Sequence, residues 1–304
     1  MSKGQVMEFL RTKMHVLWLR ITGYWRRYNP FRTAECAELY FRDRLNRHHY
    51  HFEDPNTLPQ IRKSDVIFVF GSGGSLQDIP AAEWEKINRH DTLGWRLFVY
   101  QEWVDATLLM ARELGGVDYF DGRKPRLRAA LEFGQKFAEN PRFKQTKVLV
   151  QGGWSATSGN RLFGYRLVPE DRVYMRFQNG SRDPLAMPAE SFAEGVTHGN
   201  GSLTDAINIA YLGGWKHIVL IGVDLYDNQY FLTPKGEDNE RWVGTVDAAN
   251  PNSTVASGIV NDIGRWVPWL NERGVSISVY NPRSLMKAIM PVFSWDMIEP
   301  PRKS

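Results

Sequence analysis

Residues 66–76 read Val-Ile-Phe-Val-Phe-Gly-Ser-Gly-Gly-Ser-Leu, an apolar run of β-forming residues that ends in a loop of glycines and serines. A helical pattern begins directly afterwards, over 78–85. Such a loop lets the main chain approach a ligand, and the N–H groups of the following helix favour an anion such as phosphate. Leu76 replaces the third glycine of G-x-G-x-x-G, and no Gly-Lys-Ser/Thr follows, so neither standard phosphate motif is present. An ordinary tight strand-to-helix turn is the alternative.

Strand and helix patterns alternate along the rest of the chain. Strands that alternate with helices of about ten or more residues pair in parallel through right-handed crossovers. We therefore expect an α/β fold, a Rossmann-like parallel sheet flanked by helices, with a lid region at about 227–258. After the first strand, further strands are predicted over 92–100, 119–120, 147–151, 172–176, 217–223 and 275–280, and helices over 102–114, 126–139, 202–212 and 259–273.

The composition is that of an ordinary globular protein. The chain has 304 residues, of which 42% are hydrophobic and 24% charged, enough to bury a large core. Its single cysteine, Cys36, excludes an intramolecular disulfide and fits a reducing compartment. No apolar run of about 18 residues is present, and the start lacks a signal-peptide pattern. We expect a cytoplasmic protein.

The first 63 residues differ in composition from the rest and are predicted to form an N-terminal extension and linker. Residues 1–32 carry seven Lys or Arg and one acid, and Leu10, Met14, Leu17, Ile21 and Trp25 form one helical stripe. This basic amphipathic pattern is typical of a helix on an anionic membrane surface, hence of a peripheral location; a helix packed on the protein's own core is the alternative. No nucleic-acid module accompanies it. Residues 33–63, including His48, His49 and His51, are interpreted as a solvated linker rather than a metal site.

A second informative stretch covers residues 199–226. It reads as a small-residue loop, a helix that begins at Ser202 and ends at Gly-Gly, and a buried strand that ends near Asp224. Ser202 is a natural N-cap, beside N–H groups that could hold an anion. Asp224 and Tyr226 follow the carboxyl end of their strand, the edge where ligands gather in open parallel sheets and where 71–75 also lies. An Asx turn is the alternative role for Asp224.

These two stretches, together with Tyr-Asn-Pro-Arg-Ser-Leu at 280–285, resemble the bacterial sialyltransferases of glycosyltransferase family 42. The resemblance extends over 65–290, but only these three blocks match the family closely. We take 64–290 as the catalytic domain and 291–304 as a C-terminal tail. Archaeal pterin pyrophosphokinase-like proteins share the first two. The resemblance implies a GT-A-like sialyltransferase variant of the Rossmann fold, a CMP-activated acidic sugar as donor, inversion at the anomeric carbon, a cell-surface glycan or glycolipid as acceptor, and no metal or other cofactor.

The resemblance also implies roles for individual residues. Ser202 would lie near the phosphate or sugar, and Ser284 at the edge of the site. Asp224 and Tyr226 would lie near the cytidine. The loop residues Gly71, Ser72, Gly73, Gly74 and Ser75 would lie along the nucleotide.

The chain departs from the family at the general base. The family's base is a lid histidine with tyrosines close by, but residues 252–258 contain neither residue type. His198, at the mouth of the same crevice, is the first candidate, because an imidazole titrates near working pH; a turn residue is the alternative. Asp247 and Asp262 are the carboxylate candidates. Arg96 stands where the family tends to have asparagine, and could grip the donor carboxylate or be a surface charge.

Two other functions stay open at this point. A pyrophosphokinase-like enzyme on the same fold would need ATP and a divalent metal, but the chain has no Asp-x-Asp pair to hold the metal. A non-catalytic, membrane-associated nucleotide-binding partner would explain the missing lid histidine. The favoured hypothesis is a metal-independent transferase whose partners are a CMP-sugar, a glycan or glycolipid, and an anionic membrane surface, with no nucleic acid.

Overall fold

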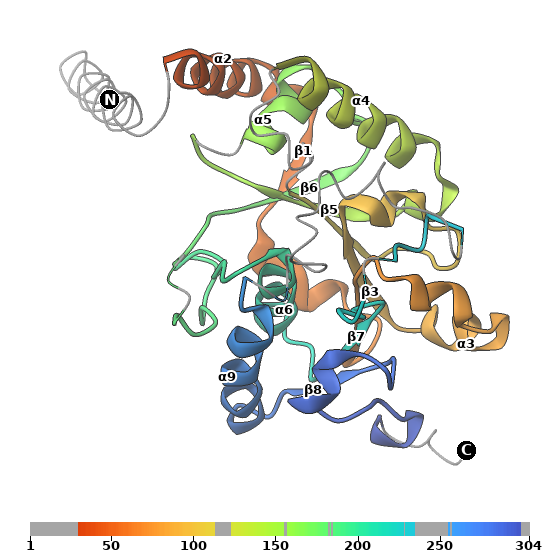
Figure 1. Cartoon of the computed structure of the whole chain (residues 1–304). Coiled ribbons are helices and arrows are strands. Elements are labelled where there is room, and N and C mark those ends of the chain that lie inside the picture. Colours follow the sequence, from red (N-terminus) through yellow and green to blue (C-terminus); the bar gives the residue numbers. More distant parts are fainter. Residues whose placement is uncertain are drawn as a thin grey trace.

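The computed structural model describes residues 30–298, apart from 113–122, 155–156, 182, 184, 228, 235–254 and 256. Its centre is an eight-stranded sheet in the order β1-β6-β5-β4-β3-β2-β7-β8, in which every neighbouring pair of strands is parallel (Figure 1). This confirms the α/β, Rossmann-like architecture. The strands are β1 (His51–Glu53), β2 (Val66–Phe70), β3 (Asp91–Trp95), β4 (Leu108–Ala111), β5 (Lys147–Gln151), β6 (Val173–Phe177), β7 (His217–Ile221) and β8 (Ser276–Val279).

Helices cover both faces of the sheet, because the central strands bury both sets of side chains. In β2, Ile67 and Val69 face the core formed with α6 and α9, whereas Phe68 and Phe70 face the core formed with α3, α4 and α5. The two sets alternate along the strand, as its period of two requires. The helices are α2 (Pro30–Asn46), α3 (Ala81–Ile87), α4 (Arg123–Glu139), α5 (Thr157–Gly164), α6 (Ser202–Leu212) and α9 (Ile259–Glu272).

The strand order reverses beside β2. From β2 the chain adds β3, β4, β5 and β6 on one side, and then returns to place β7 and β8 on the other. Ligands of open parallel sheets bind outside the carboxyl ends of the strands at such a switch point. The loop that follows β2 and the segment that follows β7 therefore meet at the position where a ligand is expected.

Two sequence predictions between β3 and β5 are wrong. The helix expected over 102–114 is replaced by β4, whose side chains are all buried within the sheet. A short run such as Leu-Leu-Met-Ala fits a buried strand and a buried helix equally well by its periodicity. The strand expected over 92–100 stops at Trp95, because Arg96 has a φ of 46° and residues 96–100 form a 3₁₀ turn. Residues 119–120 lie outside the described residues.

The stretch 33–63, expected to be a linker, is part of the domain. It forms α2, which packs on α5, and β1, which extends the sheet by pairing with β6. Cys36 and Leu39 of α2 are fully buried. At the other end of the chain, Phe293 and Trp295 of the expected tail pack on Phe68.

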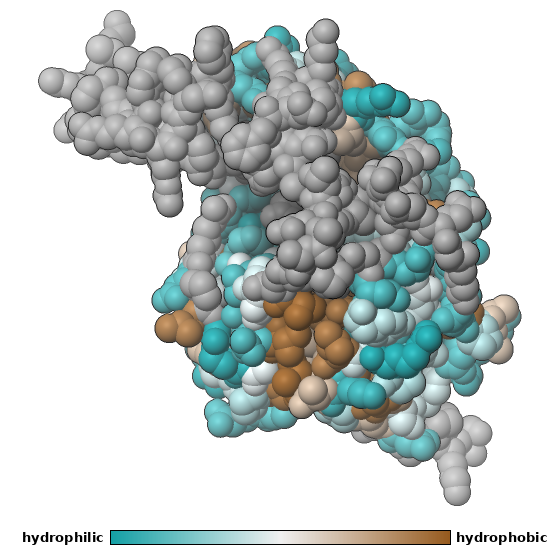
Figure 2. All heavy atoms as spheres, viewed as in Figure 1, coloured by the Kyte–Doolittle hydropathy of each residue, from teal (hydrophilic) through white to brown (hydrophobic). Residues whose placement is uncertain are grey.

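The N-terminal amphipathic pattern over 1–29 lies outside the described residues. Within the described part of the chain, none of the helices is both long and apolar enough to cross a membrane. In the view of Figure 2 the surface of the described residues is mostly hydrophilic, and their hydrophobic side chains gather in a patch low in the centre of that face.

Candidate functional site

The loop that follows β2 is clamped to the segment that follows β7. Asp224, which is 3% exposed, accepts hydrogen bonds from the Ser75 N–H (2.9 Å), the Ser75 hydroxyl (2.5 Å) and the Asn281 amide (2.7 Å). The N–H groups of Gly71 and Gly73 donate to the carbonyls of Ile221 and Gly222. The Asp224 carboxylate therefore occupies the position at the start of the turn that an external anion would take.

The glycines of this loop provide room for the neighbouring chain. A Cβ on Gly71 would overlap the Gly222 carbonyl, and one on Gly73 would overlap the Asp224 carboxylate. The Gly74 N–H donates to Gln229, so the N–H groups of Gly71, Gly73, Gly74 and Ser75 all have protein acceptors. They are not available to a departing phosphate in this structure, contrary to the sequence-based expectation.

Tyr226 and Ser284 lie beside this clamp. The Ser284 hydroxyl is fully buried, donates to the Val223 carbonyl at 2.5 Å and accepts from the Met286 N–H, so it holds the turn after β8. Tyr226 is 37% exposed. Partial burial raises the pKa of its phenol, and the hydrogen bond from Asn281 opposes this shift. Of the predicted nucleotide contacts at this switch point, Tyr226 is the one with substantial exposed surface. Contact of these residues with a nucleotide stays a prediction.

The strongest chemical arrangement lies at His198. Its Nδ1 lies 2.8 Å from a carboxylate oxygen of Asp205, in the first turn of α6, and the other carboxylate oxygen bonds the Arg112 guanidinium at the end of β4. Asp205 is fully buried, Arg112 is 3% exposed, and the imidazole is 16% exposed. A buried carboxylate that fixes one ring nitrogen sets the tautomer and the orientation of an imidazole, the arrangement found in general bases.

The loop ahead of α6 is held by side chains of α6 and α9. The Gly199 N–H donates to the Thr204 hydroxyl, and the Asn200 N–H donates to the Asp262 carboxylate. Asp262 is 2% exposed and also bonds Arg265, so the structure places this candidate base in an anchoring position. The N-cap is Gly201 rather than Ser202, which is the first helical residue.

Strained main chain occurs on the same edge of the sheet. Arg96, directly after β3, and Leu225, directly after Asp224, are two of the three non-glycine residues with positive φ among the described residues. Such conformations cost about 1–3 kcal/mol each and gather at functional sites. Arg96 is half-buried at the carboxyl end of β3, next to β2, so it lies on the edge where the donor carboxylate was expected.

Asp205 and Arg112 are not among the site residues predicted from the sequence. An Asp in the first turn of a helix is usually read as a favourable charge at the helix N-terminus, and Arg112 falls where a helix was predicted. Asp247 and most of the expected lid lie outside the described residues. No group of three or more His, Cys, Asp or Glu that could hold a metal ion occurs within the described ranges.

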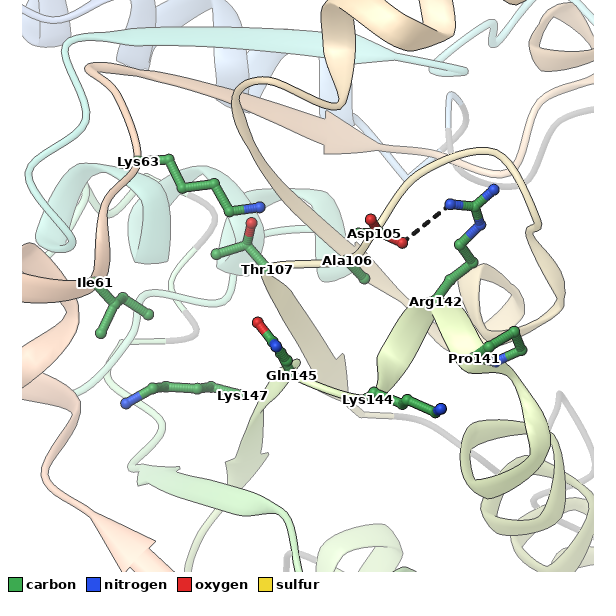
Figure 3. A pocket seen from close by; sticks show the side chains of 10 residues that line it. All are labelled: Ile61, Lys63, Asp105, Ala106, Thr107, Pro141, Arg142, Lys144, Gln145 and Lys147. Atoms are coloured by element: carbon green, nitrogen blue, oxygen red, sulfur yellow. Dashed lines mark hydrogen bonds and ion pairs between the residues drawn. The ribbon is translucent and has the colours of Figure 1, made fainter.

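Two further cavities lie at opposite edges of the sheet. One, of about 430 Å³, lies at the amino ends of β4 and β5, and Lys63, Lys144, Lys147 and the Arg142–Asp105 ion pair surround it (Figure 3). The other, of about 300 Å³, lies at the carboxyl ends of β5 and β6 and contains three arginines. We call the second cavity the arginine pocket.

The chain matches no model of a known protein family, and no curated protein sequence matches it significantly. What it has in common with family 42 therefore stays a resemblance carried by three short blocks.

Proposed function

We propose that the protein is an inverting, metal-independent glycosyltransferase that moves an acidic sugar from a CMP donor to a glycan or glycolipid, with His198 as the general base. The observation that carries the proposal is the buried chain of contacts from Arg112 through Asp205 to His198. The Asp205 carboxylate, held by the buried guanidinium, fixes Nδ1 and so orients the imidazole toward the acceptor.

The position of this group fits a transfer reaction. Arg112 directly follows β4, two strands from β2, so its main chain lies about 10 Å along the sheet edge from the loop at the switch point, at about 4.8 Å per strand. That distance lets one donor extend from a nucleotide at the switch point to a sugar beside the imidazole. Arg96 follows β3, the strand between them, where a guanidinium can pair with the carboxylate of an acidic sugar.

The leaving phosphate is best accommodated at the start of α6. Because the N–H groups of Gly71, Gly73, Gly74 and Ser75 are taken by protein acceptors, we place the phosphate at the first turn of α6, beside the base. Its N-cap, Gly201, makes no side-chain cap, and the helix dipole adds partial positive charge. Ser202, at the first helical position, is then close to the phosphate, as the resemblance implies.

In the reaction, the acceptor hydroxyl attacks the anomeric carbon on the face opposite the CMP. The bond between the anomeric carbon and the phosphate oxygen breaks, its electron pair leaves with CMP, and the hydroxyl proton passes to Nε2 of His198. Nδ1 stays bonded to Asp205 throughout. His198 thus takes the role that the resemblance assigns to the missing lid histidine.

The test is CMP release from a panel of CMP-activated acidic sugars, with and without a chelator, combined with calorimetric titration of CMP. We expect chelator-insensitive release and a fall of about 10²–10⁴ in kcat for His198→Ala, the range typical of a lost general base. His217→Gln is the matched control, because His217 also bonds through Nδ1 but lies at the amino end of β7.

Three results would contradict the proposal. Equal loss of kcat in both variants would indicate structural damage. Retention of kcat in His198→Ala would exclude the imidazole as base. Magnesium-dependent binding of ATP without binding of CMP would favour the pyrophosphokinase-like alternative.

A further inference from the structure

The arginine pocket brings together three segments that are distant in sequence, 40–47, 152–153 and 176–178. Arg44 comes from α2, Arg47 from the turn that follows α2, and Arg176 from β6. The remaining wall consists of Tyr40, Gln178 and the pair Gly152 and Gly153, which directly follows β5. It is therefore a cavity at the carboxyl edge of the sheet, on the same edge as His198 but beyond β4.

The charges around the pocket do not balance. Asp43, which is fully buried, accepts hydrogen bonds from both outer nitrogens of Arg176 and from Arg47 at 3.2 Å. Arg44 donates a hydrogen bond to the Tyr40 hydroxyl at 2.7 Å. Among the described residues that line or adjoin the pocket, three guanidinium groups thus share one carboxylate, which leaves a charge of about +2 at the cavity.

Two of the three guanidinium groups are incompletely paired below the surface of the cavity. The Nε atoms of Arg47 and Arg176 are buried and have no partner among the described residues. Burial, together with repulsion from Arg47 and Arg44, lowers the pKa of Arg176, although its hydrogen bond with Asp43 raises it. An anion in the cavity would relieve this repulsion.

The main chain allows close approach to the cavity. Gly153 has a φ of 109°, a conformation that other residues rarely adopt, and no side chain projects from it or from Gly152. Guanidinium groups around a cavity, with glycine main chain on one side, match the geometry of phosphate-binding sites.

The pocket is connected to the proposed base by paired main chain. The Val196 N–H donates to the Gln178 carbonyl at 2.8 Å, and the His198 N–H donates to the Ser181 carbonyl at 3.0 Å. Gln178 lines the pocket, and its partner Val196 is two residues from His198. At about 3.3 Å per residue, the pocket and the imidazole are on the order of 10 Å apart.

We propose that the arginine pocket binds a phosphate monoester, and that this phosphate belongs to the acceptor of the transfer reaction. The second part rests on the function proposed above. A phosphate monoester carries about −1.5 to −2 at neutral pH, which matches the local charge better than a single carboxylate does. The substrate class is then a phosphorylated glycan or glycolipid that lies across the edge of the sheet, with its phosphate in the pocket and its hydroxyl at His198.

The experiment is calorimetric titration with inorganic phosphate at constant ionic strength, with acetate as the monoanion, on the wild-type protein and on Arg44→Gln and Arg47→Gln. Arg42→Gln is the matched control, because it removes an equal charge from α2, where Arg42 pairs with Glu38 outside the pocket. We expect saturable phosphate binding that each pocket variant weakens about tenfold or more, the value of one charge-assisted contact. We expect weaker acetate binding and no effect of the control.

Titration of CMP on the same variants separates this proposal from the proposed function. Unchanged CMP binding in Arg44→Gln, with weakened phosphate binding, supports the acceptor assignment. Phosphate binding that is absent, or that is equally strong in all variants, overturns the pocket even if CMP binds. Phosphate binding that needs Arg44, in a protein that does not bind CMP, leaves the phosphate site intact and overturns the transferase. A loss of CMP binding that parallels the loss of phosphate binding assigns the phosphate to the nucleotide and overturns the acceptor role.

Discussion

Substitution of Asp205 by asparagine tests the buried group on which the proposed mechanism depends. The variant keeps the size and shape of the side chain but removes the negative charge between Arg112 and His198. Arg112 is 3% exposed and would stay charged, so it would lose its counter-charge in a place that water does not reach. Breaking a buried ion pair from one side costs about 3–5 kcal/mol, a large part of the 5–15 kcal/mol that typically separates folded from unfolded domains.

The assay is urea unfolding followed by far-ultraviolet circular dichroism. With a slope of about 3 kcal/mol per molar urea, the midpoint of Asp205→Asn should fall by about 1 M or more. Asp105→Asn is the matched control, because Asp105 also pairs with an arginine but both side chains are well exposed, at 61% and 39%. An exposed pair contributes about 1 kcal/mol or less.

A second variant separates charge from packing. In Arg112→Met/Asp205→Leu neither side chain is charged, so most of the stability lost in Asp205→Asn should return. The reasoning would be refuted if Asp205→Asn were no less stable than Asp105→Asn. It would also be refuted if the double variant were as unstable as Asp205→Asn, because the cost would then come from packing.

Three further predictions concern other parts of the structure. Gly73→Ala should lower the melting temperature by the equivalent of about 1–3 kcal/mol, because the added Cβ would overlap the Asp224 carboxylate. Gly201→Ala should cost far less, because its Cβ would have its nearest neighbour at 3.7 Å. Equal costs for the two variants would contradict the close packing of the loop. Burial lowers the pKa of His90, and Asp91 opposes this shift, so the unfolded chain takes up the proton first and the free energy of unfolding should fall as the pH drops below about 6.5. His90→Gln should flatten that part of a plot of unfolding free energy against pH. An unchanged slope would show that His90 is not the source of the pH dependence. Ser284→Ala should lower the free energy of unfolding in urea by about 1 kcal/mol, the value of a lost helix cap, without changing the affinity for CMP. A large loss of CMP affinity at unchanged stability would instead identify Ser284 as a ligand contact.

The sequence was most informative where long segments have one strong pattern. The apolar run before Gly71, the helix from Ser202 and the strand before Gly222 appear at their predicted places, because a buried parallel strand and a helix between clear start and stop signals are local patterns. The parallel pairing followed from the alternation of these elements. The edge of the sheet where the loops meet could be predicted for the same reason, since all parallel strands end on one side.

Short and peripheral elements could not be predicted in this way. The four residues of β4 have no periodicity that separates strand from helix, and only pairing with β3 and β5 makes them a strand. The stretch 33–63 looked like a linker because its anchors are distant in sequence: Asp43 bonds Arg176, and β1 needs β6 as its partner.

The same distinction between local patterns and long-range contacts applies to the candidate site. The amino-acid sequence by itself determined which loops reach the carboxyl edge of the sheet, and it singled out His198 and Asp224 there. Only the tertiary structure decided what these residues do: Asp224 accepts the N–H groups that a phosphate was expected to use, and His198 is oriented by Asp205 and Arg112. The reason is physical, because the fate of a buried charge depends on the partners that folding brings within a few ångströms, and Arg112 is 93 residues from Asp205 along the chain.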